Sequence, residues 1–597
     1  MKKKPDWGRL VLAAVQAGLM VIWFRCISRF ELYSVNGDRF NKFDGLYLIC
    51  MALAVLGMAE GALRPRRLTR RESVVAGLAA GVYGLATVLA NYPAFDQAPL
   101  EAALSLAGGF CVGWQIVGLG IRRLPLMVKP RGCSHPKRVF WGSFGVIWAV
   151  YLLYFFFAAY PGLFSRDSFS AVAQCVTGRY DNTSPFWHTM VVKLCLEAGG
   201  LLGLDMSGSV GIYAVLQSMA MAAAFAYVLV TLYQAGMPRW CLAPVAAVYG
   251  LAAYNIAYSV TLWKDIPFSL GALTMVTALY RILKGLGSSK RNAAVFTVGS
   301  LFFCLMRTNG LYACLVLTLV LVPSVRRLGK RLLVILCAVL AVGWLCNGPV
   351  LDALEVPDTD FVEALAIPFQ QVTRVVAEGE AVSEADLALL EEIFDLEQVK
   401  ALHDPLSVNN MKFEAFRRDR QDYLRENLGT YAGLWLRLGV QHPWTYLKAW
   451  VDETVGYWNA GYNYWIWPEP DLDAQRGAEL GIVRPALENP VKEAFAGLFH
   501  VQQRLPLVAQ PLFGIGFQVW ILLLCMILCA VKGREEWYLG LPTLVILLGL
   551  WVGTPVFAEF RYAYPVFVTV PLVLPLTVFR AEKGVPKISG DIPGNAS

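Results

Sequence analysis

Charged residues stand at the ends of several long apolar segments of this chain. One apolar run closes at Tyr160-Pro161-Gly162, and the chain continues through Ser165-Arg166-Asp167-Ser168. A carboxylate at such a boundary is partly desolvated, so Asp167 could accept a proton from an incoming hydroxyl group. The alternative is that Asp167 only caps the amphipathic helix predicted from Asp167 to Gly178, because Asp favours helix N-termini.

Three further turns bring charges to comparable positions. They read Trp263-Lys264-Asp265, Arg307-Thr308-Asn309-Gly310 and Glu559-Phe560-Arg561-Tyr562. Arg binds phosphate through its bidentate fork and Lys binds it as a point charge. Charges near hydrocarbon are costly and usually line a cavity, which favours one shared site over four unrelated ion pairs. Local pairing, or snorkelling of Lys264 to the headgroups, is the alternative.

The elements that must position these residues are membrane helices. The 597 residues are 57% hydrophobic and 16% charged, more apolar than one soluble core can hide. A span needs about 20 apolar residues. Such runs predict an all-α integral membrane protein with about fourteen spans. The predicted spans are 9–27, 43–63, 73–91, 102–121, 139–160, 209–233, 241–260, 266–283, 293–307, 310–325, 332–347, 511–531, 537–553 and 562–579.

The Lys and Arg residues predict the orientation of these spans. They cluster between apolar runs rather than along one face, so the net charge of +8 is no sign of nucleic-acid binding. Counting through the spans puts every basic loop on the cytoplasmic side, together with both termini. These loops are 64–71, 122–138, 284–291, 326–331 and 532–534. The four charged turns then lie on the extracytoplasmic face of a bacterial plasma membrane.

The same count divides the chain into four parts. Residues 1–138 form a four-helix N-terminal extension, 139–347 a membrane core with a first outer loop at 161–208, 348–510 an outer region, and 511–597 three spans and a cytoplasmic tail. Ser383-Glu384-Ala385-Asp386 resembles a capping box, which predicts a mainly helical outer region.

A dense aromatic stretch, from Trp435 to Trp467, lies near the end of this outer region. It favours a helix lying at the membrane interface, and stacking of some of the rings on sugars is the alternative.

The location of the charged turns limits the chemistry. Outside the cytoplasm there is no ATP or nucleotide sugar, so an enzyme there needs an activated donor that has already crossed the membrane. A sugar on polyprenyl phosphate meets this need. We expect displacement at the anomeric carbon, with Asp167 as the base and the cations stabilising the departing phosphate. Inversion is the default outcome, because no pair of carboxylates suited to a covalent intermediate is evident.

These turns resemble the GT-C superfamily of polytopic glycosyltransferases, in which an Asp or Glu of an early outer loop is the catalytic base. More closely, they resemble an uncharacterised bacterial family of GT-C-like membrane proteins, over roughly 139–580. The resemblance implies that Asp167 is catalytic and that the first four spans are an addition. Predicted substrate-binding residues are Ser168, His188, Lys264, Asp265, Arg307, Asn309, Arg561 and Tyr562. A local hydrogen-bonding role is the alternative for His188.

No cofactor is predicted with certainty. Many GT-C members have an acidic pair where this chain has Arg166-Asp167-Ser168, so a divalent metal is possible but not favoured. Asp358-Thr359-Asp360 and Asp471-Leu472-Asp473 have DxD spacing, which often arises by chance. Cys175 and Cys195 could pair, and two unpaired thiols are the favoured interpretation.

Other classes of protein remain open. A lipid-linked glycan flippase would be expected to show repeats and polar groups near the midplane, and this chain shows neither. A glycan polymerase or ligase would rely on Arg and His of the outer region, and a non-catalytic scaffold would need neither. Candidates for the ligase role are Arg374, Arg417, Arg418, His403 and His442. The predicted partners are the lipid donor, an envelope glycan, lipid or protein acceptor, and the bilayer, with no nucleic acid.

Overall fold

The protein is all-α and its helices are unusually apolar. The computed structural model describes residues 7–28, 34–35, 38–39, 44–63, 67–95, 97–129, 134–182, 184–324, 330–357, 360–460 and 474–581. Within these ranges, eight helical segments are long and apolar enough to cross a membrane, and four more apolar helices are shorter. The eight are Arg70–Leu89, Pro99–Arg123, Pro136–Ala159, Met206–Gln234, Asp265–Lys284, Lys330–Ala353, Glu535–Gly553 and Phe560–Val578. This pattern is consistent with a polytopic membrane protein.

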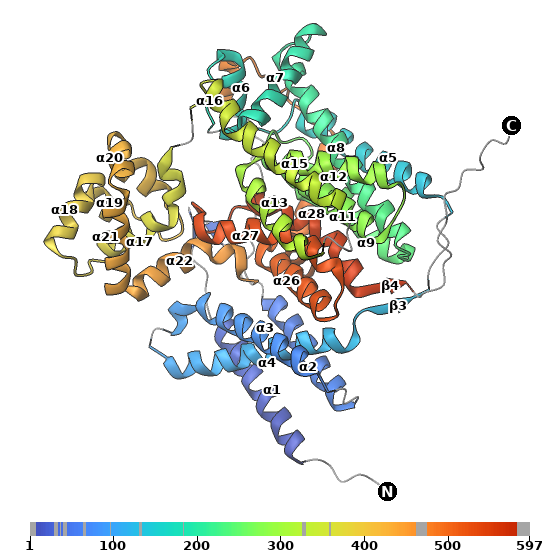
Figure 1. The fold of residues 1–597 in the computed structure, drawn as a ribbon, viewed down its shortest axis with the longest axis vertical. Coiled ribbons are helices and arrows are strands. Elements are labelled where there is room, and N and C mark those ends of the chain that lie inside the picture. The colour runs from blue at the N-terminus through green and yellow to red at the C-terminus, as the bar shows by residue number, and fades with distance from the viewer. Residues whose placement is uncertain are drawn as a thin grey trace.

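The N-terminal helices form a bundle of their own, drawn in blue at the bottom of Figure 1. They are α1 (Trp7–Ser28), α2 (Asp44–Leu63), α3 (Arg70–Leu89) and α4 (Pro99–Arg123), followed by the short strand β3 (Leu126–Val128). The strands β1 (Ser34–Val35) and β2 (Asp38–Arg39) pair between α1 and α2, and the 3-10 turn η1 (Tyr92–Phe95) links α3 to α4.

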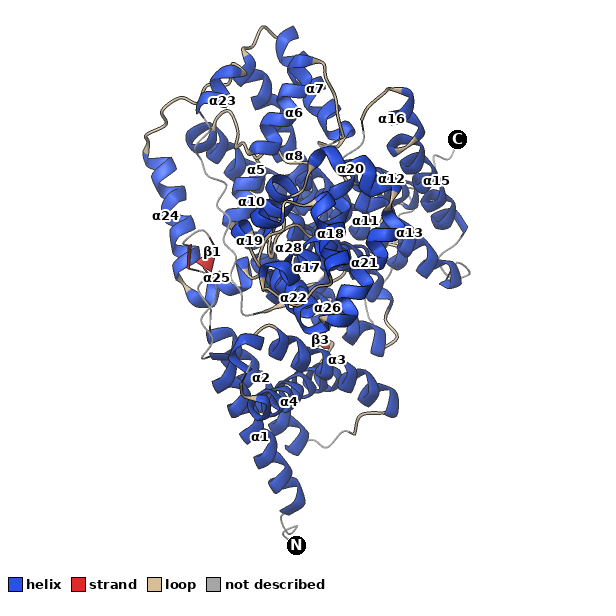
Figure 2. Cartoon of the chain, turned by 90° about the vertical axis from the view of Figure 1, so that its left-hand side faces the viewer, coloured by secondary structure: helices blue, strands red, loops and turns tan. Residues whose placement is uncertain are grey.

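The central helices enclose the largest apolar core of the molecule. Figures 1 and 2 show them as one bundle beside the N-terminal helices. The bundle comprises α5 (Pro136–Tyr154), continued by the π-helix η2 (Phe155–Ala159), α8 (Met206–Gln234), α9 (Arg239–Leu251), α11 (Asp265–Lys284), α12 (Ser289–Met306), α13 (Thr308–Leu321), α15 (Lys330–Asn347), α26 (Ile515–Val531), α27 (Leu541–Gly553) and α28 (Phe560–Val578).

Shorter elements connect these helices. They are α6 (Arg166–Thr177), α7 (Phe186–Leu201), α10 (Ala253–Tyr258), η3 (Val322–Ser324), α16 (Pro349–Ala353), α23 (Ala474–Glu479), α24 (Pro490–Arg504), α25 (Pro506–Phe513), η7 (Glu535–Gly540) and β4 (Phe579–Ala581). Strand β4 pairs in parallel with β3, which ties the end of α28 to the end of α4.

One predicted span is not a continuous helix. The run 241–260 divides into α9 and α10 at Ala252, whose φ of −62° and ψ of 130° are extended. The groups released at this break find partners, because the Gln502 amide donates to the Leu251 carbonyl at 2.7 Å and accepts from the Ala253 N–H at 2.9 Å. A break inside an apolar region is tolerated where other protein groups satisfy the backbone.

The residues near 293–307 form α12, which is not among the twelve apolar helices above.

A mainly helical lobe stands out from the bundle, at the left of Figure 1. Its elements are η4 (Phe361–Leu365), α17 (Ala366–Ala377), α18 (Glu384–Ile393), α19 (Leu396–Leu402), η5 (Met411–Ala415), η6 (Arg418–Arg420), α20 (Gln421–Glu426) and α21 (Leu428–Gln441). These elements share a separate apolar core. Ser383 caps α18 by accepting the Asp386 N–H at 3.1 Å, so the predicted helix start is confirmed.

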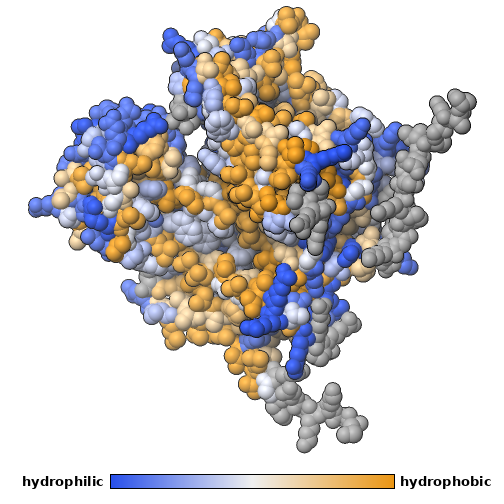
Figure 3. All heavy atoms as spheres, in the orientation of Figure 1, coloured by the Kyte–Doolittle hydropathy of each residue, from blue (hydrophilic) through white to orange (hydrophobic). Residues whose placement is uncertain are grey.

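The surface separates into polar and apolar regions. In Figure 3, hydrophilic residues gather on the lobe and hydrophobic residues cover the exposed face of the bundle. On α13 and α15, Leu319, Val334 and Trp344 are all more than 60% exposed. Apolar side chains exposed at this density along long helices fit a lipid environment rather than water.

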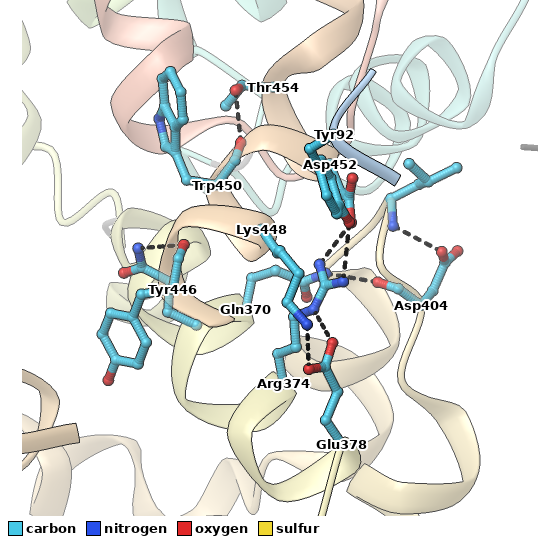
Figure 4. A network of polar contacts seen from close by, with 12 residues as sticks. Tyr92, Gln370, Arg374, Glu378, Asp404, Tyr446, Lys448, Trp450, Asp452 and Thr454 are labelled. Carbon is cyan, nitrogen blue, oxygen red and sulfur yellow. Dashed lines mark hydrogen bonds and ion pairs between the residues drawn. The ribbon is translucent and has the colours of Figure 1, made fainter. Parts of the chain in front are cut away.

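Helix α22 (Pro443–Trp458) joins the lobe to both helix bundles. Figure 4 shows its Asp452 accepting hydrogen bonds from Arg374 of α17 at 2.7 Å and from the hydroxyl of Tyr92 at 2.8 Å. Glu378 pairs with Arg374 at 2.6 Å and with Lys448 at 2.6 Å. Because Arg374 and Asp452 are buried and paired, this network holds the lobe against the N-terminal bundle.

The aromatic residues of α22 differ in burial along the helix. Tyr457 and Trp458 are buried where α22 packs against α26 and α27, and Trp450 donates to the Trp551 carbonyl at 2.7 Å. Trp444, at the start of the helix, is 47% exposed, and the predicted interfacial position of this stretch stays a prediction. Residues Tyr462 to Trp467 of this stretch lie outside the described residues.

The close contact of α12 with α13 gives a test of the fold. A Cβ on Gly310 would overlap the Phe303 carbonyl, whereas a Cβ on Gly145 of α5 meets nothing within 4 Å. We expect Gly310→Ala to destabilise the protein by about 1–3 kcal/mol through overpacking. Gly145→Ala should leave the thermal unfolding temperature in detergent unchanged. Equal unfolding temperatures for the two variants would contradict the packing described.

Candidate functional site

The turn that carries Asp167 is held by one long-range and one local hydrogen bond. Gly162 has a φ of +141°, a conformation that suits glycine, and its carbonyl accepts from Arg484 at 2.6 Å. The Ser165 N–H then donates to the Ser168 hydroxyl at 3.0 Å, and α6 begins at Arg166. Ser165, not Asp167, is therefore the residue at the helix cap. Asp167 lies in the first turn of α6, and its carboxylate is free to face other elements.

Backbone pairing brings the Asp167 turn to the Lys264 turn. Leu163 forms a parallel bridge with Thr261, in which the Leu163 N–H donates to Val260 at 2.9 Å and the Leu262 N–H donates to Leu163 at 3.1 Å. The Ser168 hydroxyl adds a hydrogen bond to the Leu262 carbonyl at 2.7 Å. Two segments about a hundred residues apart thus run side by side.

Two cations from distant turns meet the Asp167 carboxylate. Arg561, at the start of α28, donates from Nη1 to Asp167 Oδ2 at 2.7 Å. Lys264 Nζ lies 3.7 Å from the same oxygen. The Asp167 side chain retains 34% of its surface, whereas those of Lys264 and Arg561 retain 16% each. Burial strengthens this pairing relative to an ion pair in water, and the carboxylate stays within reach of a ligand.

A second ion pair lies beside the first. Arg307 pairs with Asp265, whose side chain is almost fully buried at the start of α11. The ring of Tyr562 links the two pairs, because the guanidinium carbon of Arg307 lies 4.7 Å from its centroid and that of Arg561 lies 5.0 Å from it. The other oxygen of Asp265, Oδ2, is buried and accepts no hydrogen bond from a described residue.

The four charged turns therefore form one group, which we call the charged cluster. Its members are Asp167, Lys264, Asp265, Arg307, Glu559 and Arg561. Their predicted catalytic and binding roles remain predictions.

The lobe supports the turn before Arg561. The Phe557 N–H donates to the Leu406 carbonyl at 2.8 Å, and the Phe557 carbonyl accepts from the Gly456 N–H at 3.1 Å. A Cβ on Gly456 would lie 2.7 Å from that carbonyl, so α22 and this turn approach more closely than a larger residue permits. The position of Arg561 thus depends on both the lobe and α22.

The charged side chains of the cluster shift one another's pKa values. Burial alone would raise the pKa of Asp167, but Lys264 and Arg561 hold this pKa below its usual value. Burial lowers the pKa of Lys264, and the neighbouring carboxylates oppose that effect. In this arrangement Asp167 is a carboxylate and a weak base, because its negative charge is already stabilised.

Glu559 is a member of the cluster that the sequence did not single out as a site residue. Its Oε1 lies 3.4 Å from Arg561 Nε. Burial raises its pKa to about 7, with Asp265 and Asp167 adding to the rise and Arg561 opposing it. The signal available in the sequence was only its place two residues before Arg561 in the same turn.

Three predicted substrate-binding residues occupy other positions. Ser168 is fully buried and its hydroxyl donates to the Leu262 carbonyl, so it helps to position the turn. His188 is 3% exposed and lies 2.9 Å from the Tyr213 hydroxyl, and burial lowers its pKa to about 4. Asn309 lies in the first turn of α13, and no ion pair or hydrogen bond joins its side chain to the described members of the cluster.

His188 instead belongs to a hydrogen-bonded chain behind the Lys264 turn. Tyr213 donates to Gln217 at 3.0 Å, and Gln217 donates to the Thr261 carbonyl at 2.7 Å. The neutral ring of His188 thereby helps to hold the turn, and its predicted role in substrate binding stays a prediction.

The remaining candidate residues named from the sequence are not members of the charged cluster. Arg374 belongs to the network of Figure 4, and His442 lies 2.9 Å from the Ala381 carbonyl within the lobe. Cys175 and Cys195 are free thiols in one apolar cluster. No group of three or more described His, Cys, Asp and Glu residues has the arrangement of a metal site. Residues 358–359 and 471–473 of the DxD tripeptides lie outside the described residues.

The fold and the cluster together define a class: an all-α protein whose long apolar helices are consistent with a polytopic membrane protein and whose charges gather at helix ends. The chain belongs to a family of unknown function, DUF6020, whose model matches residues 179–587. The match includes Lys264, Asp265, Arg307 and Arg561, and it begins after Asp167. The family's description assigns it no activity and no GT-C membership. No curated protein and no solved structure matches the chain.

The raised pKa of Glu559 gives a test by stability. A carboxyl whose pKa rises on folding, here from 4.5 to about 7, favours the folded state at low pH and loses this advantage as pH increases between those values. The free energy of unfolding of Glu559→Gln should therefore exceed that of the native chain at pH 8, and the two should be nearly equal at pH 4.5. The difference at pH 8 is about 3 kcal/mol at most, because one pKa unit corresponds to about 1.4 kcal/mol. Thermal unfolding in detergent at both pH values measures this difference. Glu391→Gln, at an exposed position of α18, is the control, and a Glu559 effect that does not vary with pH would contradict the assignment.

Proposed function

We propose that this protein is a GT-C-type membrane glycosyltransferase that moves a sugar from a polyprenyl-phosphate donor to an envelope glycan, lipid or protein acceptor. The observation that supports the proposal is the meeting of Asp167 with Lys264 and Arg561, and of Arg307 with Asp265, at one end of an apolar helix bundle. Three cations beside a partly accessible carboxylate suit a phosphate leaving group and an acceptor hydroxyl.

The proposed orientation follows from the basic residues at the other end of the bundle. Helix α11 begins at Asp265 in the cluster and ends with Arg281 and Lys284 in its last turn. The positive-inside rule puts Lys284 and the neighbouring Lys532 and Arg534 in the cytoplasm. The cluster and the lobe then face the extracytoplasmic side of a bacterial plasma membrane, where a lipid-linked sugar is the available activated donor.

Binding of the donor would raise the pKa of Asp167 and so make it a stronger base. A donor phosphodiester offers Lys264 and Arg561 a second anionic partner besides Asp167, and its negative charge increases to two as polyprenyl phosphate departs. Once these cations turn to the phosphate, the pKa of Asp167 rises toward its ordinary value, because their electrostatic effect is what holds it down. The carboxylate becomes a stronger base only when the donor is present, which would limit wasteful hydrolysis.

The reaction is a single displacement. The acceptor oxygen forms a bond to the anomeric carbon while the bond from that carbon to the phosphate oxygen breaks, and the acceptor proton passes to Asp167. The electron pair leaves with polyprenyl phosphate, whose charge Arg561, Lys264 and Arg307 stabilise. One displacement inverts the anomeric configuration.

The activity test uses the purified full chain in detergent with radiolabelled polyprenyl-phosphate sugars and follows the release of polyprenyl phosphate. Asp167→Asn should reduce kcat by about a hundredfold to ten-thousandfold, the range for loss of a general base. His442→Ala, in the lobe, should retain activity. The opposite result for the two variants would favour a polymerase or ligase, and full activity in Asp167→Asn would contradict the mechanism.

The orientation is tested separately by labelling intact cells. Glu397, whose side chain is 86% exposed on the lobe, is replaced by Cys and treated with a membrane-impermeant maleimide. We expect Glu397→Cys to be labelled above the background of the native chain. Lys290→Cys, in α12 near the basic end, should be labelled only after the cells are opened. The reverse pattern would place the lobe in the cytoplasm and remove the reason for a lipid-linked donor.

A further inference from the structure

A second polar site lies at the end of the bundle opposite the charged cluster. The cavity is lined by Tyr280 and Lys284 of α11, by Lys532 and Arg534 of the following turn, and by Arg580 of β4. Helix α11 separates Lys284 from Asp265 by nearly its whole length of 20 residues, about 30 Å at 1.5 Å per residue. The cavity volume is about 410 Å³, which lies within the range of cavities that bind small ligands.

Cations outnumber acids in the lining of this cavity. Lys284, Lys532, Arg534 and Arg580 face Glu535 and Glu536. The buried Glu536 forms ion pairs with two of the cations, because its Oε1 lies 3.2 Å from Lys284 Nζ and 3.2 Å from Arg534 Nη2. Lys532 lies 3.7 Å from Glu72, an acid of α3 outside the lining, so Arg580 is the lining cation that no described acid pairs.

Arg534 and Glu536 hold this cavity in shape. Arg534 also donates to the carbonyls of Leu576 at 2.6 Å and Thr577 at 3.1 Å, which are the free acceptors at the end of α28. The guanidinium thus fastens the 532–536 turn to α28. Glu536 is buried beside this turn, and its ion pair with Lys284 holds that amine at the cavity.

Arg580 is the cation of the lining whose side chain is most available to an anion. Its backbone is fixed, because β4 pairs with β3 in a register that sets Arg580 opposite Met127. Its side chain is exposed and forms no ion pair with any residue in the part of the chain that the structure describes. The Phe579 ring packs against Trp240 at 5.1 Å on the neighbouring side.

From this geometry we infer that the cavity binds a phosphate-bearing anion through Arg580, Lys284 and Lys532. The site stands at the ends of the apolar helices α11, α26 and α28, the depth at which phospholipid headgroups lie. Lipid headgroups and free phosphate offer the same chemistry. The inference does not depend on the proposed glycosyl transfer, because it uses no residue of the charged cluster.

The test measures binding to the purified full chain in neutral detergent by native mass spectrometry. The ligands are phosphatidylglycerol, zwitterionic phosphatidylcholine and inorganic phosphate. The variants are Arg580→Ala and Arg580→Glu, whose exposed position limits effects on folding. Lys290→Ala is the control, since Lys290 is exposed near the same end but does not line the cavity. Thermal unfolding checks that each variant is folded.

We expect phosphatidylglycerol to bind in preference to phosphatidylcholine, and Arg580→Ala to weaken it about fivefold, the effect of one cation at a membrane surface. Arg580→Glu should weaken it further, and Lys290→Ala should not. Competition by inorganic phosphate at millimolar concentration would support the site with a free anion as its ligand. The inference is overturned if neither phosphate source binds, or if folded Arg580→Glu binds both as the native chain does.

Discussion

The ion pair of Asp167 with Arg561 is the interaction on which the architecture of the cluster depends. It joins residues 394 positions apart, one in a surface helix and the other at the start of the last apolar helix. Neither charge is tolerable alone at this partly desolvated boundary, because an unpaired ion there loses its hydration without compensation. The fold must therefore bring the ends of α5, α10 and α28 together, and the backbone bridge between Leu163 and Thr261 completes the arrangement.

The same interaction relates the outer parts of the molecule to the site. Arg561 follows a turn that the lobe holds at Leu406 and that α22 holds at Gly456. Helix α22 in turn is fixed through Asp452 to Arg374 and Tyr92, from the lobe and the N-terminal bundle. A contiguous set of buried contacts thus connects three parts of the chain to one guanidinium group. Displacement of any of them would change the geometry around Asp167.

Local patterns in the sequence predicted local structure well. The start of α18 at Ser383 and the amphipathic helix that ends at Gly178 both follow from short-range capping and periodicity. Sequence patterns were less informative where the local structure depends on contacts with residues far away in the chain. The run 241–260 contains no signal for its break at Ala252, because the stabilising amide belongs to Gln502. The burial of Tyr457 and Trp458 likewise depends on distant segments, because the end of α22 packs against α26 and α27.

By itself the sequence determined the apolar helical class, the helix ends that carry charge and the residue types available there. Hydropathy and charge are properties of each segment, so they can be read without a fold. Tertiary structure alone decided that Arg561 pairs with Asp167, that Glu559 pairs with Arg561, and that His188 contacts Tyr213. These outcomes depend on distances between segments far apart in the chain, and only the packing of helices sets such distances.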